Sequence, residues 1–493
     1  MTIPVPVSEP VPTAAESDRA SLHSRVISGS MWTLVSYGAS QVLRLAGSLL
    51  FAHLLYPGAF GLSSLVFIFV QGLAMFSDIG IGPSLVQSRR GEDPAFINTA
   101  WTIQVVRGFI LWTVSLIFAR PFAAWYAEPE LAALIPVAAF GTIISSFNST
   151  RIFLSSRRIS LGRITIIDFA SQTLGLVAMV VWCLVTRSVW AFVFGNLIGT
   201  TAKMILSYVA LDGVRNGFRF DRVAFTELTH FGRWVFVSTA LSFLTSQVDR
   251  LMLGTFVPIA LLGVYSLSMN LASVPPMVTS SLAGWVLFPL FAHHSRTDAK
   301  AYEKAIFSAR RFILEGALFL FAGLALVSPA FFRILYDARY AEAAWMTQLL
   351  TVPMWFWILM LSADRAVLAV GESKTLAISN AASLAGKFVA CYAGFHLAGV
   401  PGFILGLALG NIAGHVPIVL SLRRLGVHVV RQDLQYTAIA AGCIGGAYLV
   451  QNWTTSILGE RWRTHVELAV AILVLVPLGL RLMKSGRAAL SGR

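Results

Sequence analysis

Charged side chains inside long apolar stretches are the residues of this sequence with the clearest capacity for chemistry. The cations are Arg44, Arg107, Arg250 and Lys387, and the carboxylates are Asp78 and Asp249. A charge near the middle of a bilayer costs about 2.5 kcal/mol or more, so such residues normally face a partner or a water-filled cavity. Arginine binds phosphate through paired hydrogen bonds. The surplus of cations therefore predicts a cavity that holds an anionic head group.

A structural role competes with binding at each of these positions. Asp78 or Asp249 could pair with an arginine and hold two helices together, or could bind a coupling proton or Na⁺, and the sequence leaves both interpretations open. Asp168, Lys203 and Glu315 are a different case. A structural role is favoured for them, and Asp168 and Lys203 are close enough to the inner interface to reach it.

Glycine and proline interrupt two apolar stretches at comparable places. Gly80, Gly82 and Pro83 lie in one stretch, and Pro275 and Pro276 lie in the other. Proline removes a backbone hydrogen bond and kinks a helix. Broken helices at corresponding positions in two halves of a transporter mark its transport path. We therefore predict hinges here, with a role in packing as the alternative.

No pattern in the sequence indicates an enzyme. It contains no phosphate-binding glycine loop, paired CxxC motif or HExxH motif. Cys183, Cys391 and Cys443 all fall in apolar stretches, where cysteine is usually a small packing residue. We expect no cofactor, no metal site and no catalytic residue.

The elements that must position the charged residues are membrane-spanning helices. Apolar residues make up 56% of the 493 positions and charged residues 12%, about half the charged share of a soluble protein. A spanning helix needs roughly 20 apolar residues. We predict an all-α integral membrane protein with about fourteen transmembrane helices, at residues 31–54, 60–86, 97–119, 131–150, 164–186, 189–210, 232–254, 258–289, 311–332, 343–363, 374–396, 400–421, 434–451 and 464–483.

The placement of positive charge predicts how these helices are oriented. The net charge is +14, but most lysines and arginines fall in alternate loops, which is the distribution expected of cytoplasmic loops. The charge therefore indicates topology, with both termini cytoplasmic, and gives no reason to expect nucleic acid as a partner. Residues 1–24 lack an apolar core, so we predict a disordered cytoplasmic tail and no signal peptide.

An internal repeat divides the chain into halves. Residues 32–65 align without gaps to 234–267, an offset of 202 positions. Identical pairs include Trp32 with Trp234, Leu49 with Leu251, Gly61 with Gly263 and Ser64 with Ser266. Parallel repeats are typical of transporters that bind substrate between two lobes. The predicted units are a six-helix lobe at 25–210, a cytoplasmic linker at 211–231, a second six-helix lobe at 232–424, and two extra transmembrane helices with a cytoplasmic tail at 425–493.

Four short stretches resemble a known family. Residues 51–62, 78–87, 249–254 and 263–265 are similar, in order and spacing, to the Wzx-type polysaccharide flippases of the MOP superfamily, and the likeness covers about residues 25–430. The resemblance implies two lobes that work by alternating access in the bacterial inner membrane. It implies an anionic, lipid-linked oligosaccharide as substrate, with its undecaprenyl diphosphate held by the four cations. A polysaccharide polymerase and export machinery would be partners.

Three other functions compete with this interpretation. A MATE-type drug or cation antiporter shares the architecture but calls for acidic residues in its cavity, whereas cations predominate here. A lipid II-type flippase would differ mainly in the sugar that it carries. A polysaccharide polymerase is the rival from the enzyme class, and it usually needs a larger outside loop than any predicted in this chain.

Overall fold

The computed structural model describes residues 38–77, 80–157, 161–281 with 283, 299–458 and 462–490. The predicted tail at 1–24 and the carboxylate Asp78 lie outside the described residues. Within them, all regular structure is helical. The predicted all-α membrane fold is therefore confirmed.

The described residues of the first half form eight helical segments. The chain enters α4 through a defined cap: the Asp93 side chain accepts a hydrogen bond from the Ala95 amide, and Pro94 begins the helix. The hydrogen bond from Arg90 holds the pKa of the Asp93 carboxyl below its usual value. The segments are residues 38–54, α2 (Pro57–Met75), α3 (Ile81–Gln87), α4 (Pro94–Trp125), α5 (Leu131–Ser146), α6 (Arg151–Arg157), α7 (Leu161–Thr186) and α8 (Trp190–Val209).

The second half contains longer helices. One of them, α14, is two helices joined across a kink at Ala398 and Gly399, where Gly399 has a φ of 63°. The elements are α9 (Arg222–Phe256), α10 (Ile259–Ala272), residues 274–281, α12 (Ala299–Leu335), η1 (Ala338–Tyr340), α13 (Glu342–Ala369), α14 (Ser373–Arg424), α15 (Val430–Leu458) and α16 (Arg463–Leu490).

The helices agree with the predicted membrane spans. Each of the fourteen predicted ranges overlaps helical residues. In the described part of the chain, nine helices are long and apolar enough to cross a membrane, and α5 with α6, bent by 60°, would make a tenth. The kinked α14 counts once although it holds two predicted spans. The number fourteen is therefore consistent with the fold but remains a prediction.

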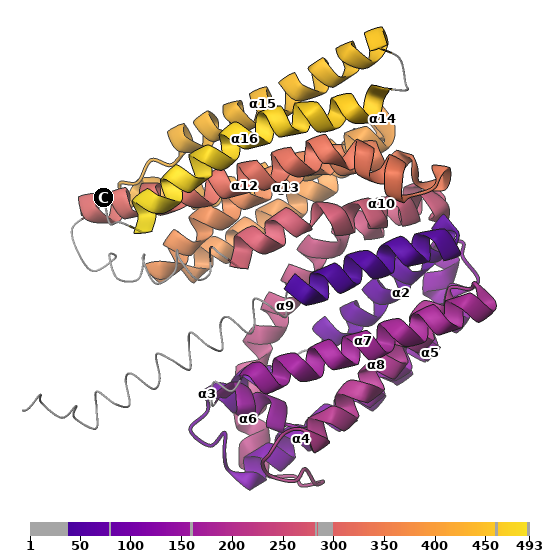
Figure 1. The fold of residues 1–493 in the computed structure, drawn as a ribbon. Helices are drawn as coiled ribbons and strands as arrows, with labels where there is room; N and C mark the ends of the chain where they lie inside the picture. The colour runs from indigo at the N-terminus through magenta and orange to yellow at the C-terminus, as the bar shows by residue number, and fades with distance from the viewer. Residues whose placement is uncertain are drawn as a thin grey trace, which may run out of the picture.

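The two halves meet through α2 and α10. Figure 1 shows α2 to α8 in one group, α10 and α12 to α16 in another, and α9 running between them. One buried apolar cluster extends over both groups and includes Leu65 of α2, Leu262 and Tyr265 of α10, and Tyr340 of η1. The halves therefore share a continuous core where α2 and α10 touch.

The contact between α2 and α10 repeats itself at equivalent positions. A methyl group added at Gly61 would lie 2.1 Å from the Ile259 carbonyl oxygen, and one added at Gly263 would lie 1.9 Å from the Pro57 carbonyl oxygen. Ser266 donates a hydrogen bond of 3.1 Å to Ser64 between them. Gly61 and Gly263 are equivalent positions of the repeat, 202 residues apart, and so are Pro57 and Ile259. The contact of Gly61 with Ile259 is therefore repeated by the contact of Gly263 with Pro57. The two copies of the repeat are thus related by a local two-fold axis through the serine pair.

The segment expected to be a linker is attached to the first half. Its residues 211–221 are not helical, but α9 begins at Arg222 with Asp221 as its N-cap. The Asp221 amide donates to the Thr99 hydroxyl of α4. Leu228 of α9 packs in a cluster with Ile81 of α3 and Phe96 of α4. The predicted range 211–231 therefore contains the first turns of α9, which pack on the first half.

Helix α15, the first of the two C-terminal helices, is anchored by buried charges. Arg310 of α12 is fully buried, and its Nη2 donates to Asp433 of α15 at 2.7 Å. His415 of α14 lies 2.9 Å from the other oxygen of the Asp433 carboxylate. A buried charge needs such partners, so this network fixes α15 against α12 and α14.

Candidate functional site

Arg44 lies in a cavity of about 480 Å³ that both polar and apolar side chains line. The walls come from helix 38–54, α2, α7 and α8, and α10 contributes Asn270 from the second half of the chain. Arg44 is exposed, and no residue that the structure describes bonds to its guanidinium. Arg44 is thus available to a ligand.

The other charges of this cavity neutralise each other. The Lys203 ammonium of α8 lies 2.7 Å from the Asp168 carboxylate of α7, and both side chains are partly exposed. The lining of the cavity therefore has one net positive charge, which comes from Arg44. The amides of Gln172 and Asn196 complete a lining that can hold an anionic ligand rich in hydrogen-bonding groups.

Close packing of α7 and α8 forms one wall of this cavity. A methyl group on Gly175 would lie 3.0 Å from the Gly195 carbonyl oxygen, and Gly199 also meets Gly175. Aromatic rings form another part of the lining: Phe192 of α8 lies edge-on to Phe51 and Phe60, with ring centroids 5.3 and 5.5 Å apart. A rigid wall of this kind keeps the polar groups of the cavity in place.

Arg250 and Lys387 lie beside Asp249 in a second polar cluster. Asp249 is buried and accepts a hydrogen bond of 2.8 Å from the Tyr265 hydroxyl. Lys387 of α14 donates to the Thr245 carbonyl at 3.0 Å, one helical turn before Asp249. Arg250 bonds to Gln247 at 3.2 Å, while its buried Nε has no hydrogen-bond partner among the described residues. The negative charge of Asp249 therefore offsets part of the positive charge of Arg250 and Lys387.

Arg107 belongs to a third environment, at the broken end of α2. Its guanidinium donates to the Ser77 hydroxyl at 2.9 Å and to the Ala74 carbonyl. It therefore satisfies backbone and side-chain acceptors where α2 ends. The structure thus brings Arg250, Lys387 and Asp249 together, and places Arg44 and Arg107 elsewhere.

The expected hinge residues lie at or directly after breaks between helices. Helix α2 ends at Met75 and α3 begins at Ile81, with Gly80 in the left-handed region at a φ of 65°. Gly82 and Pro83 fall in the first turn of α3. Helix α10 ends at Ala272, and the helical residues 274–281 that follow contain Pro275 and Pro276. Motion at these points remains a prediction.

Sequence reasoning missed the combined polar lining of α7 and α8. It favoured a structural role for Asp168 and Lys203 and did not place them in one pocket with Arg44, whereas they pair with each other and line the Arg44 cavity. A signal was present: Asp168, Gln172 and Gly175 follow i, i+4, i+7 spacing, as do Asn196, Thr200 and Lys203. Residues so spaced share one helix face, and two such faces predict a common pocket.

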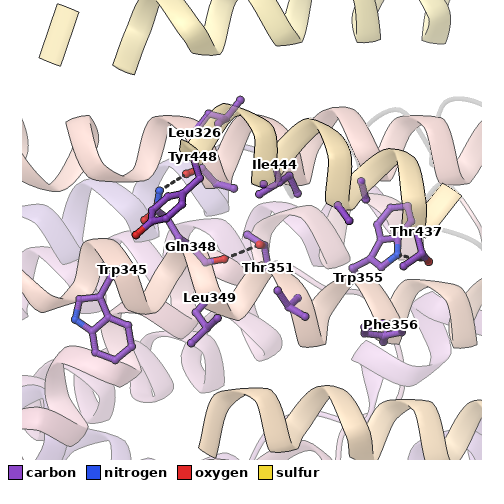
Figure 2. Close-up of a pocket in the computed structure, with 15 residues that line it drawn as sticks. Leu326, Trp345, Gln348, Leu349, Thr351, Trp355, Phe356, Thr437, Ile444 and Tyr448 are labelled. Atoms are coloured by element: carbon purple, nitrogen blue, oxygen red, sulfur yellow. Dashed lines mark hydrogen bonds between the residues drawn. The ribbon is translucent and has the colours of Figure 1, made fainter. Parts of the chain in front are cut away.

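A separate cavity of about 580 Å³ between α12, α13 and α15 is apolar (Figure 2). Its few polar groups bond internally: Trp355 donates to Thr437 at 3.0 Å, and Gln348 to the Ala325 carbonyl at 2.8 Å. Such a lining suits a hydrocarbon chain. Among the described residues, no group of three or more histidine, cysteine or acidic side chains could hold a metal ion.

Known proteins match this chain over much of its length. The model of a family described as "Polysaccharide biosynthesis protein" matches residues 50–345. The teichuronic acid biosynthesis protein TuaB of Bacillus subtilis (strain 168) is 20% identical over 72% of this chain and 73% of its own length. The lipopolysaccharide biosynthesis protein WzxC of Escherichia coli (strain K12) is 22% identical over 55% of each chain. The succinoglycan biosynthesis transport protein ExoT of Rhizobium meliloti (strain 1021) is 22% identical over 63% of each.

Solved structures share the fold. The lipid II flippase MurJ in an inward closed conformation superposes with a TM-score of 0.68 at 13% identity, over 91% of this chain and 98% of MurJ. An inward-facing MATE family transporter of the MOP superfamily gives 0.62 at 14% identity, over 78% and 94%.

The family match covers more than half of the sequence, and it includes α2 to α10, all of α12 and η1. The resemblance to Wzx-type proteins, expected from the sequence, is confirmed by the family match and the named relatives. The chain belongs to the polysaccharide biosynthesis protein family.

Proposed function

We propose that this protein translocates lipid-linked oligosaccharide precursors across the inner membrane for the synthesis of a surface polysaccharide. Three relatives named for teichuronic acid, lipopolysaccharide and succinoglycan biosynthesis support this function. The substrate would be an undecaprenyl-diphosphate-linked repeat unit, as the family resemblance implies. A polymerase and export machinery would then receive the flipped unit.

The observation that carries the proposal is the Arg44 cavity. Among the described residues, its lining has one cation without a bonded partner, a neutral ion pair and several amide and hydroxyl groups, and both halves of the chain contribute to it. A guanidinium suits a phosphate oxygen pair, while amides and hydroxyls suit a sugar. Arg250 and Lys387 would form a second cationic position, which Asp249 partly neutralises.

The proposed mechanism is alternating access by two lobes, residues 25–210 and 232–424. With both termini cytoplasmic, the α2–α10 contact lies at the outer side of the membrane. This conformation would therefore be closed towards the outside. Translocation would require that contact to open, after which the cavity would release its ligand to the outer leaflet.

Deletion of the gene in its host tests the function. We expect loss of one surface polysaccharide and accumulation of its lipid-linked repeat unit on the cytoplasmic leaflet. Wild-type protein should restore the polymer, and Arg44→Ala should restore it poorly. Arg120→Ala is the matched control, because Arg120 is also an exposed arginine on a helix but does not line the cavity.

The same experiment separates the alternatives. Repeat units that reach the outer leaflet and stay unpolymerised would point to a polymerase. An unchanged polymer with increased drug sensitivity would point to a MATE-type antiporter. Accumulation of lipid II with arrested wall synthesis would point to a lipid II-type flippase.

A further inference from the structure

A second cationic cavity, of about 870 Å³, lies away from the Arg44 cavity, between α12, α15 and α16. Each of these helices contributes one arginine: Arg311 from α12, Arg431 from α15 and Arg481 from α16. The proposed transport function assigns no role to these residues.

The arginines outnumber the carboxylates beside them. Glu315 is only 2% exposed, and its Oε1 accepts hydrogen bonds from the Nε atoms of Arg311 at 3.2 Å and Arg481 at 3.1 Å. Tyr436 donates to the same oxygen at 3.0 Å. One carboxylate thus orients two guanidiniums, and Arg431 has no bonded partner in the described part of the chain. Three positive charges face one negative charge.

The bonds to Glu315 leave the phosphate-binding edges of two arginines available. Both guanidiniums use Nε towards Glu315, and no described residue accepts a hydrogen bond from their Nη atoms. The Arg481 guanidinium also lies over the Tyr436 ring, 5.6 Å from its centroid. These contacts hold the arginines in position before any ligand arrives, which lowers the entropic cost of binding.

The cavity is at one end of the membrane-spanning helices. Arg311 follows closely on the start of the apolar span Ile306–Leu335, and Arg481 is near the end of the span Arg463–Ser485. Phe307, Ala438 and Ile439 form an apolar part of the same wall. A ligand held here would place its charge at the membrane surface and its apolar part along the helices.

We infer that this cavity binds the head group of an anionic phospholipid. The charge requires an anion, and arginine suits its phosphate. The apolar wall favours a lipid over a free ion. The buried pair of Arg310 and Asp433, 2.7 Å apart, fixes the distance between α12 and α15 directly beside the cavity. The lipid would thus connect the two C-terminal helices to the second half of the protein.

Lipid-dependent stabilisation of the purified full-length protein tests this site. The thermal midpoint in detergent is measured against cardiolipin, phosphatidylglycerol and phosphatidylcholine. We expect the two anionic lipids to raise the midpoint of the wild type, and Arg431→Gln to bind them about fivefold more weakly. Arg431 has no protein partner to lose. Arg423→Gln is the matched control, since Arg423 is exposed at the nearby end of α14 but outside the cavity, and it should behave as the wild type.

Three outcomes would overturn the inference. One is an unchanged response to anionic lipid in both Arg431→Gln and Arg311→Gln/Arg431→Gln. Another is an equal effect of phosphatidylcholine, which would indicate apolar contact alone, or of inorganic phosphate at the same ionic strength. The third is displacement of bound cardiolipin by equimolar undecaprenyl diphosphate, read by native mass spectrometry, which would assign the cavity to the transported lipid.

Discussion

The environment of each charged residue decides what it can do. Asp249 is buried and has a tyrosine donor, whereas Arg44 is exposed to a cavity and has no partner among the described residues. The sequence could identify both as charges within apolar stretches. It could not identify Tyr265 as the partner of Asp249, because that contact depends on how α10 packs against α9.

Removal of the Tyr265 hydroxyl should destabilise the protein. Tyr265→Phe keeps the buried ring but leaves the Asp249 carboxylate without its 2.8 Å donor, at a cost of about 1–3 kcal/mol in the free energy of unfolding. Thermal or denaturant unfolding in detergent measures the change. Tyr392→Phe is the control, since Tyr392 is 56% exposed. Equal stability of the two variants would show that the Asp249 bond contributes nothing.

Two ion pairs of equal length should differ sharply in their contribution to stability. Arg310 and Asp433 are 2.7 Å apart and largely buried, whereas Arg163 and Asp212 are also 2.7 Å apart but 60% and 93% exposed. Arg310→Ala removes the arginine from the buried Asp433 carboxylate, which keeps only His415 beside it, and should cost about 3–5 kcal/mol. Arg163→Ala should cost about 0–1 kcal/mol. Similar midpoints in thermal unfolding of the two variants would contradict the assigned burial.

At the scale of helices, the apolar stretches of the sequence predicted that a helix exists better than they predicted where it begins and ends. Helix α9 begins at Arg222, ten positions before the predicted span, because its first turns pack on α3 and α4. A search for spanning segments detects only the apolar part of a helix. The two predicted spans 374–396 and 400–421 correspond to the two helices of α14, which meet at the kink at Gly399. The sequence thus predicted this break correctly.

The glycines at the α2–α10 contact should be irreplaceable. Gly263→Ala would place a methyl group 1.9 Å from the Pro57 carbonyl oxygen, a backbone atom that moves only with its helix. We expect separation of the helices, with at least about 2 kcal/mol of lost stability and failure to complement the deletion strain. Gly445→Ala is the control, because a methyl group there has no neighbour within 4 Å, and alanine favours helix. Normal complementation by Gly263→Ala would mean that the contact is not close.

At the scale of the whole molecule, the repeat is the feature that connects sequence to mechanism. The gap-free offset of 202 positions predicted two equivalent helix pairs, and Ser64 and Ser266 meet on the axis between them. The sequence could not show that the two copies touch each other. It also could not show that α9 contacts both halves: Leu228 of α9 packs on the first half, and Lys387 of α14 in the second half donates to α9. These are tertiary contacts, which no local pattern encodes.

A cross-link on this axis should stop transport if the halves separate there. The two serine oxygens are 3.1 Å apart, so Ser64→Cys/Ser266→Cys can approach the disulfide length of about 2.05 Å. The variant is made after Cys183, Cys391 and Cys443 are replaced by serine. Oxidation should block translocation, with the lipid-linked repeat unit retained on the inner leaflet, and a reductant should restore it. Each single-cysteine variant should transport under both conditions. Full transport by the oxidised double variant would mean that α2 and α10 remain in contact throughout the cycle, and that the cavity must open by bending within a half.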